Sequence, residues 1–220
     1  MTIGFLKQRA TNEYDCISSG QKKVVYPESD GLPMADNTKQ FRWIVTVQGG
    51  LDAIYRDDPN VFVAGNLFWY PVEGDNTIRV APDIFVVFGR PKGDRGSYLQ
   101  WLEDNIAPQV AFEILSPENR AGKLVEKFKF YEHYGVEEYY VFDPDGAELA
   151  SWTRAKEELI RIPEMHGWVS ARLHVRFELV DDDLRLYAPD GKKFATYVEL
   201  AERADKLAAQ LKALGIEPEA

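Results

Sequence analysis

The N-terminal part of the chain changes from an unpatterned stretch to a helical one. Residues 1–37 are rich in turn formers and show no sustained period, which predicts an irregular arm. Asp36, Asn37 and Thr38 are suitable helix N-caps, and apolar residues recur at helical spacing after them. This apolar set is Phe41, Ile44, Val45, Leu51 and Ile54. We therefore predict a helix that begins near residue 38, with two adjacent glycines weakening its middle.

Short apolar runs separated by turn signals follow this helix. They are residues 61–63, 67–70, 77–80 and 84–88. Their β-branched and aromatic residues are typical of strands, and we predict that they form a meander. Later runs of the same kind are residues 148–153, 159–162 and 184–187. We expect these to extend or flank the sheet.

The middle of the chain predicts a strand, a helix and a second strand. Residues 110–115 are apolar except at Glu113, which is typical of a buried central strand carrying one carboxylate. A helical stripe runs from about residue 119 to 134, Gly135 is placed to end it, and a strand pattern resumes at residues 139–142. This order predicts a right-handed crossover between two parallel strands.

The C-terminal segment predicts a helix with one narrow apolar seam. The seam consists of Leu200, Ala204, Leu207, Leu211 and Leu214. Alternating spacings of four and three residues place these side chains on one stripe. Two heptads are too short for an independent coiled coil, so we expect the helix to dock on the body or on a second subunit. The predicted organisation is an arm over residues 1–37, one domain over residues 38–195 and an amphipathic helix over residues 196–220.

Composition permits one core and excludes several kinds of protein. The 220 residues are 45% apolar and 13% aromatic, enough to fill a single well-buried core. Cys16 is the only cysteine, which excludes an internal disulfide framework and favours a reducing cytoplasm. Because there is no signal-peptide pattern and no long apolar run, we expect no membrane partner. The formal charge of −10 means that any nucleic-acid contact has to come from a local basic patch.

Three charged residues are candidates for chemistry at the edge of the predicted sheet. Asp83 stands at the head of a strand, Glu113 lies within an apolar strand, and Lys127 lies on the following helix. A carboxylate inside an apolar strand is costly unless it is paired or binds a cation. A Mg²⁺ ion shared by Asp83, Glu113 and the carbonyl of Ile114 would compensate for it, with room for a phosphate oxygen and a water. Lys127 could then orient that water or stabilise the transition state.

The alternative is that these residues have structural roles. Glu113 could pair with a core arginine or lysine, Asp83 could be a turn residue, and Lys127 could be a solvated charge on a helix face. The pattern alone leaves both interpretations open.

Several segments, taken in order, resemble a known family. They are Ala81-Pro82-Asp83-Ile84-Phe85-Val86, Phe112-Glu113-Ile114-Leu115-Ser116-Pro117, and residues 131–144, which read YEHYGVEEYYVFDP. Their order and spacing resemble the Uma-type putative restriction endonuclease family of the PD-(D/E)XK nuclease superfamily. DGLPMADNTKQ, VFVAGNLFWYP and the closing Ala- and Leu-rich helix also fit, so the resemblance covers nearly the whole chain.

The resemblance implies a fold, an activity and a set of site residues. The fold is a restriction-endonuclease-like α/β (α+β) core, with a central mixed sheet flanked by helices and a C-terminal helix. The activity is endonucleolytic hydrolysis of DNA phosphodiester bonds with Mg²⁺ or Mn²⁺. Asp83 and Glu113 correspond to metal ligands, and Lys127 corresponds to a catalytic lysine that has moved from strand to helix. Gln40 falls near an acidic position of the first helix, where its amide oxygen could coordinate without adding charge.

Departures from the family pattern keep other functions open. Leu115 stands where the superfamily has a lysine, and Lys123 stands where many members have an acidic residue. Together with Gln40 and the net charge of −10, they favour an alternative in which a non-catalytic nuclease fold serves as an assembly module. A further alternative is hydrolysis of RNA or another phosphodiester.

Two expectations concern partners. A basic stretch lies beside the candidate site and could contact the DNA backbone, or it could be an ordinary solvated helix face. It contains Arg120, Lys123, Lys127 and Lys129 against Glu126, and the same ambiguity applies to Arg90, Lys92 and Arg95. Cleavage of both DNA strands is easiest with two sites related by a two-fold axis. We therefore expect a homodimer, with the C-terminal helix as a candidate interface.

Overall fold

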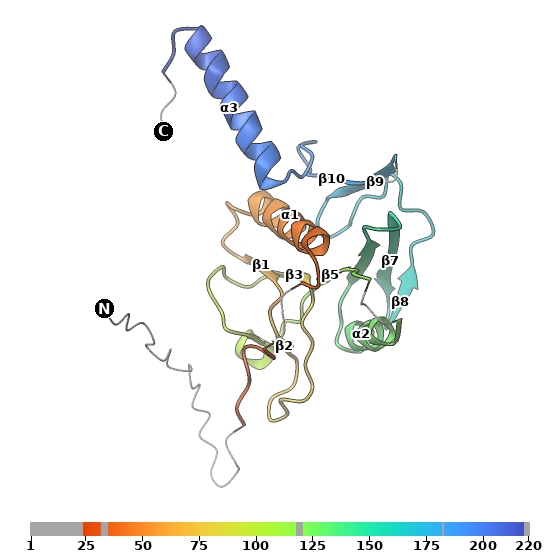
Figure 1. Ribbon diagram of the computed structural model, residues 1–220. Coiled ribbons are helices and arrows are strands. Elements are labelled where there is room, and N and C mark those ends of the chain that lie inside the picture. The colour runs from red at the N-terminus through yellow and green to blue at the C-terminus, as the bar shows by residue number, and fades with distance from the viewer. Residues whose placement is uncertain (1–23, 32–34, 118–120, 182, 218–220) are drawn as a thin grey trace, which may run out of the picture.

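The computed structural model describes residues 24–31, 35–117, 121–181 and 183–217. Its centre is a six-stranded mixed sheet (Figure 1). The strand order is β1 (Val61–Gly65), β3 (Ile84–Phe88), β5 (Val110–Ile114), β6 (Glu138–Asp143), β7 (Glu148–Ala155) and β8 (Glu158–Arg161). Only β5 and β6 run parallel, and every other neighbouring pair is antiparallel. The predicted α+β class with a central mixed sheet is confirmed.

Helices cover both faces of this sheet. α1 (Thr38–Ile54) packs on one face, where its buried residues join alternate residues of β3 and β5, such as Ile84 and Phe112, in one core cluster. α2 (Ala121–His133) lies on the other face, and its Tyr131 joins the residues that point the opposite way. The sheet therefore has an α1 face and an α2 face, and the side chain of each strand residue belongs to one of them.

The predicted first helix is confirmed, including its passage through the two glycines. Asn37 is its N-cap, and its side chain accepts a hydrogen bond from the backbone N–H of Gln40 at 2.9 Å. A Cβ added at Gly50 would lie 2.3 Å from the ring of Phe194, whereas one at Gly49 would meet nothing within 4 Å. Gly50 therefore permits a close approach of the C-terminal part of the chain, which offsets its low helix propensity.

The predicted order of strand, helix and parallel strand is also confirmed. β5 and β6 are parallel, and α2 connects them on the chain. Gly135 has a φ of +91°, and the N–H of Val136 donates to the carbonyl of Tyr131 at 3.0 Å. This is the expected way to end a helix with a left-handed residue.

The predicted meander is wrong in two respects. Residues 77–80 are not a strand: the N–H of Thr77 bonds the side chain of Asp75, and only Val80 forms an isolated bridge, with Trp69. The turn chemistry of Asp75 thus overrides the β propensity of the run. In addition, β2 (Trp69–Tyr70) lies outside the main sheet and pairs with β4 (Tyr98–Leu99), which is followed by η1 (Gln100–Leu102). A strand of two residues is too short to show an alternating pattern of apolar and polar residues in the sequence.

The C-terminal third adds a hairpin and a helix. β9 (Arg176–Val180), which was not predicted, pairs with β10 (Asp183–Tyr187) in a separate two-stranded sheet. α3 (Tyr197–Ala213) follows and has no buried residue. Of the two expected arrangements, docking on the body is therefore not seen in the described chain, and docking on a second subunit stays a prediction. No helix in the described ranges combines the length and the apolar character needed to cross a membrane.

Candidate active site

The pairing of β3 with β5 brings the two predicted carboxylates together. Ile84 is opposite Phe112 in this antiparallel pair. One step further along the same register, Asp83 stands opposite Glu113 on the α2 face. Both side chains are buried, at 8% and 3% exposure, and Asp83 Oδ2 accepts a hydrogen bond from the N–H of Ile114 at 2.7 Å. Two acids about thirty residues apart in sequence thus become cross-strand neighbours.

α2 provides two hydrogen-bond donors to Glu113. Lys127 Nζ lies 2.6 Å from Glu113 Oε2 and 3.0 Å from the carbonyl of Ala81. The hydroxyl of Tyr131 donates to Glu113 Oε1 at 2.6 Å. Lys127 and Tyr131 are four residues apart, so they share one face of the helix. Tyr131 is a site residue that sequence reasoning missed, because its position in the apolar stripe was sufficient to explain it as a core residue.

Gln40 reaches the same strand from the α1 face. Its Nε2 donates to the carbonyl of Ile114 at 2.8 Å, and its Oε1 accepts from the N–H of Asp36 at 2.8 Å. The side chain of Asp36 in turn accepts a hydrogen bond from the hydroxyl of Ser116. The amide oxygen that was expected to coordinate a metal is therefore bonded to the backbone. Asp36 was considered only as a helix cap, and its proximity to the site is a tertiary feature.

Burial and like charge shape the electrostatics of the site. Burial raises the pKa of Asp83 to about 7, with a further increase from Glu113 that the charge of Lys127 only partly offsets. Burial by itself lowers the pKa of Lys127, but the two carboxylates outweigh it and the pKa is raised, so this side chain stays an ammonium. Burial and Glu113 raise the pKa of Tyr131, which keeps its hydroxyl a donor. One cation thus faces two acids.

The oxygen donors suit a hard cation. Among the described residues no group of three or more His, Cys, Asp or Glu side chains could hold a metal. Asp83, Glu113 and the carbonyl of Ile114 would have to be completed by water, as is common for Mg²⁺. The hydrogen bonds within the described ranges use only Oδ2 of Asp83, which leaves Oδ1 as a ligand. The donor set therefore fits Mg²⁺ chemically.

The structure also contains the pairing that was the alternative to a metal. Lys127 and Tyr131 between them bond both carboxylate oxygens of Glu113. A cation that enters the site has to share Glu113 with Lys127 or displace it. Since the side chain of Lys127 is 27% exposed, it can move toward solvent more easily than a fully buried lysine could.

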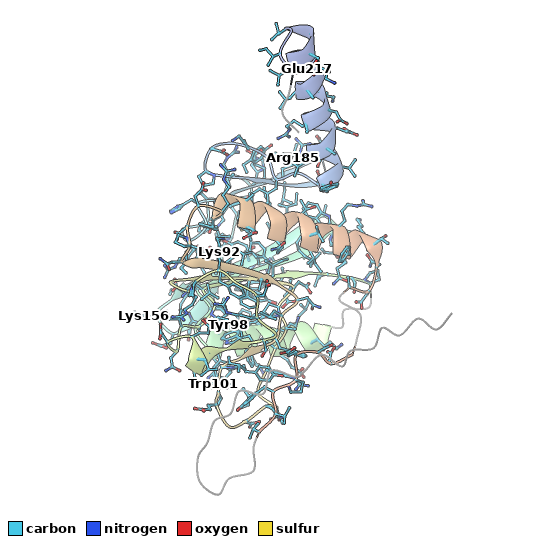
Figure 2. The ribbon with its side chains drawn as sticks, turned by 90° about the vertical axis from the view of Figure 1, so that its left-hand side faces the viewer. Lys92, Tyr98, Trp101, Lys156, Arg185 and Glu217 are labelled. Atoms are coloured by element: carbon cyan, nitrogen blue, oxygen red, sulfur yellow. The ribbon has the colours of Figure 1, made fainter. Side chains whose placement is uncertain are left out.

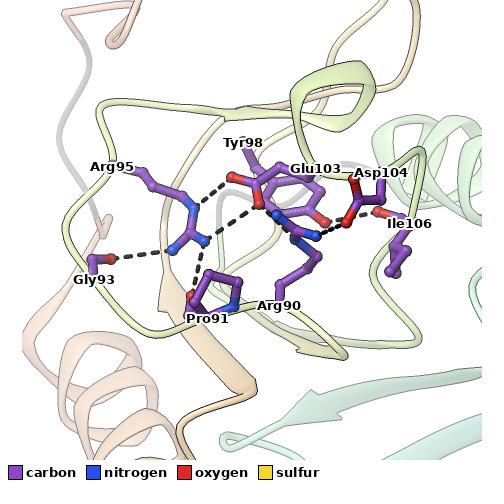
Figure 3. A network of polar contacts seen from close by, with 8 residues as sticks. All are labelled: Arg90, Pro91, Gly93, Arg95, Tyr98, Glu103, Asp104 and Ile106. Atoms are coloured by element: carbon purple, nitrogen blue, oxygen red, sulfur yellow. Dashed lines mark hydrogen bonds and ion pairs between the residues drawn. The ribbon is translucent and has the colours of Figure 1, made fainter.

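Two arginines that were candidates for DNA contact are bound within the protein instead (Figure 3). Arg90 Nε and Arg95 Nε lie 2.8 Å and 2.7 Å from the two carboxylate oxygens of Glu103. Arg90 also pairs with Asp104, and the guanidinium of Arg95 lies 3.9 Å from the ring centroid of Phe62. Both arginines follow the end of β3 that is remote from Asp83. They stabilise the loop after β3.

The remaining basic candidates divide into paired and exposed residues. Lys92 pairs with Asp52 of α1 at 3.2 Å. Lys123 and Lys129 are exposed on α2, the helix that carries Lys127. Arg120 lies outside the described residues. Among these basic candidates, Lys123 and Lys129 are therefore the ones that the described residues show exposed on α2.

Comparison with known proteins identifies the family. The sequence profile of the Uma2 family, described as a putative restriction endonuclease, matches residues 39–170, which is more than half of the chain. The chain belongs to this family. The matched region contains Asp83, Glu113 and Lys127 and ends before α3. The family membership that the sequence resemblance suggested is thus confirmed.

The solved structures that are similar to the chain include a putative nuclease. It is the crystal structure of a putative nuclease belonging to DUF820 from Anabaena variabilis ATCC 29413, at 1.96 Å resolution. The sequence identity is 20%, the match covers 63% of this chain and 74% of that chain, and the TM-score is 0.47. No curated protein matches the chain.

Proposed function

We propose that the chain is an endonuclease that hydrolyses DNA phosphodiester bonds with Mg²⁺, which Mn²⁺ can replace. The observation that carries the proposal is the buried cross-strand pair Asp83 and Glu113 beside Lys127. Like charges directly opposite each other destabilise a sheet, and burial together with the charge of Glu113 raises the pKa of Asp83. A divalent cation would offset it, and membership of the Uma2 family makes DNA the substrate class to test first.

The residues have distinct roles in this proposal. Asp83 and Glu113 hold the ion together with the carbonyl of Ile114, and Gln40, as an accessory residue, orients that carbonyl through its hydrogen bond. A bound Mg²⁺ would lower the pKa of a ligated water and offset negative charge on the phosphate. Lys127, held as an ammonium, orients the attacking water or stabilises the transition-state oxygens.

A cleavage assay on supercoiled plasmid tests the proposal. We expect the wild-type protein to nick or linearise the plasmid with Mg²⁺ or Mn²⁺. Asp83→Asn should lose at least roughly 100-fold in rate, because it removes a charged ligand that the chemistry uses. The amide oxygen of the new side chain can still accept from the N–H of Ile114, so the fold is retained. Asp52→Asn, at an exposed position, is the matched control.

The outcomes separate the roles. If wild type and Asp83→Asn cleave equally well, the assignment of Asp83 is wrong. If cleavage of RNA replaces cleavage of DNA in a parallel assay, the site is a phosphodiesterase site with a different substrate.

A non-catalytic assembly module is the second candidate. It is favoured by the closed hydrogen-bond network, in which Lys127 and Tyr131 bond Glu113 while Gln40 bonds Ile114. Such a network can stabilise the fold without any ion. Titration calorimetry with Mg²⁺ and Mn²⁺ discriminates between the candidates. If the chain is a nuclease, we expect a heat of metal binding that Asp83→Asn abolishes. If it is an assembly module, we expect no heat of metal binding that depends on Asp83.

A further inference from the structure

α3 exposes an apolar seam that the described chain does not cover. None of the residues of α3 is buried. Leu200 is 49% exposed, Leu207 is 55% exposed, and Leu214, the C-cap of the helix, is 76% exposed. A capping box between Thr196 and Glu199 orders the N-terminus of the helix. The helix stands clear of the body in two views (Figures 1 and 2). A capped helix with an uncovered leucine seam needs another molecule to bury that seam.

A cavity at the base of α3 continues this seam. Its volume is about 560 Å³, and we call it the α1–α3 groove. Val45 and Gly49 line it from α1, Tyr197 and Leu200 line it from α3, and Phe194 lies between the helices. Val45 is 46% exposed, and the space beside Gly49 is open. The groove and the seam therefore form one continuous surface that is mainly apolar. Charged residues also line the groove, namely Arg56, Asp57, Asp190, Lys192, Lys193 and Arg203.

We propose that this surface binds a second copy of the chain. In this homodimer the two α3 helices pair antiparallel about a two-fold axis, and the end of each helix enters the α1–α3 groove of the other subunit. The pairing does not depend on nuclease activity.

Side-chain size favours the antiparallel arrangement. One two-fold axis between positions 205 and 206 pairs all the seam residues of the two copies at once. The pairs are Ala204 with Leu207, Leu200 with Leu211, and Leu214 with Tyr197, which extends the seam three residues before Leu200. The small Ala204 thus meets a large partner. In a parallel pair Ala204 would face its own copy and leave a gap, which a close-packed interface does not tolerate well.

Charge favours the same arrangement. Residues 197–204 contain two acidic residues and one basic residue, whereas residues 205–213 contain one acidic residue and two basic residues. Antiparallel pairing places each half against the half of opposite net charge and also opposes the two helix dipoles. Parallel pairing would place halves of equal sign together.

The groove agrees with this register. Because Leu214 of one copy pairs with Tyr197 of the other, the C-terminal end of the partner helix arrives where Tyr197 lines the α1–α3 groove. Leu214 and Ile216, which are 76% and 53% exposed in the single chain, can then be covered by Val45 and Gly49.

Light scattering on the full chain tests the dimer. We expect the wild-type mass to be twice 25.1 kDa and Leu207→Glu to shift it to a single chain. Val198→Glu is the matched control, since Val198 is 65% exposed on α3 but lies off the seam, and this variant should remain dimeric. Gly49→Trp should weaken dimerisation at least tenfold, because the new side chain fills the groove from a position where an added Cβ meets no atom within 4 Å. A monomeric wild type at all concentrations, or a dimeric Leu207→Glu with unchanged circular dichroism, would overturn the proposal.

Cysteine crosslinking tests the orientation. In a Cys16→Ser background, Leu200→Cys and Leu211→Cys chains are mixed and oxidised. Antiparallel pairing predicts a disulfide between the two different chains and none between two Leu200→Cys chains. Crosslinking of Leu200→Cys with itself, or no crosslink in the mixture, would contradict the antiparallel dimer.

Discussion

The residue that determines most of the candidate site's properties is Asp83. Its side chain is 8% exposed, stands opposite Glu113, and has one described hydrogen-bond donor, the N–H of Ile114. The resulting pKa of about 7 means that the folded protein resists ionisation of this carboxyl group. A costly side chain of this kind is typical of a binding or catalytic position.

Replacement of Asp83 is expected to stabilise the fold. The pKa of Asp83 is about 7 in the folded state, against a model value of 3.8, so the folded state binds more protons between these values. The free energy of unfolding of the wild type therefore falls as pH rises through this window. Asp83→Asn removes this loss and should be more stable above about pH 7, by at most roughly 4 kcal/mol at about 1.36 kcal/mol per pKa unit.

Urea unfolding at a series of pH values measures this difference. The advantage of Asp83→Asn should grow from pH 4 to about pH 7 and then level off. A difference that stays constant with pH would show that Asp83 ionises in the folded protein as it does in the unfolded chain. Exposed Asp52→Asn is again the control.

Metal affinity should depend on pH for the same reason. The proton on Asp83 has to leave before its oxygen can bind a cation. We expect the association constant for Mg²⁺ to rise by about tenfold per pH unit below about pH 7 and to become level above it. Titration calorimetry with Mg²⁺ across this range measures the effect. An affinity independent of pH would place the ion away from Asp83.

At the scale of elements, the site depends on two helices that approach one strand from opposite faces. α2 brings Lys127 and Tyr131 to Glu113, and α1 brings Gln40 to the carbonyl of Ile114. Since neighbouring residues of a strand point to opposite faces, the sheet separates the carboxylate site from the Gln40 contact. The position of α1 therefore controls the orientation of one proposed ligand.

The two glycines of α1 should respond in opposite ways to substitution by alanine. Gly49→Ala meets open space and improves helix propensity, so it should raise the free energy of unfolding by up to about 1 kcal/mol. Gly50→Ala forces the ring of Phe194 to move and should lower it by about 1–3 kcal/mol. Thermal and urea unfolding of the pair measure this contrast. Equal effects would mean that Phe194 does not pack on α1 in solution.

At the scale of the molecule, α3 stands apart from the folded body. Phe194 belongs to the main core cluster, whereas no residue of α3 is buried. A chain that ends at residue 195 should therefore retain the fold of the sheet and its helices, with an unfolding midpoint close to that of the monomeric Leu207→Glu variant. Circular dichroism melting tests this expectation. A truncated chain that fails to fold would mean that α3 is part of the domain.

The sequence alone predicted the helices, the central β5–α2–β6 unit and the candidate carboxylates. These features depend on local patterns: apolar periodicity shows which residues share a face, and an acid within an apolar run is visible without knowing its neighbours. The family resemblance added Gln40 to the candidates and gave Lys127 the role of a catalytic lysine. The irregular pairings of β2 with β4 and of β9 with β10 left no comparable signal, because they depend on contacts between short segments.

The tertiary structure decided what each candidate residue contacts. The register of β3 against β5 sets Asp83 opposite Glu113, and the rotation of α2 adds Tyr131 beside Lys127. The tertiary structure also shows that Arg90 and Arg95 are bound to Glu103 and are not available on the surface. Sequence patterns report the environment of a residue within its own element, whereas its partners depend on strand register and helix packing between distant segments. That is why the two acids could be identified from the sequence, whereas the contacts of Lys127 and Tyr131 with Glu113 could be identified only from the fold.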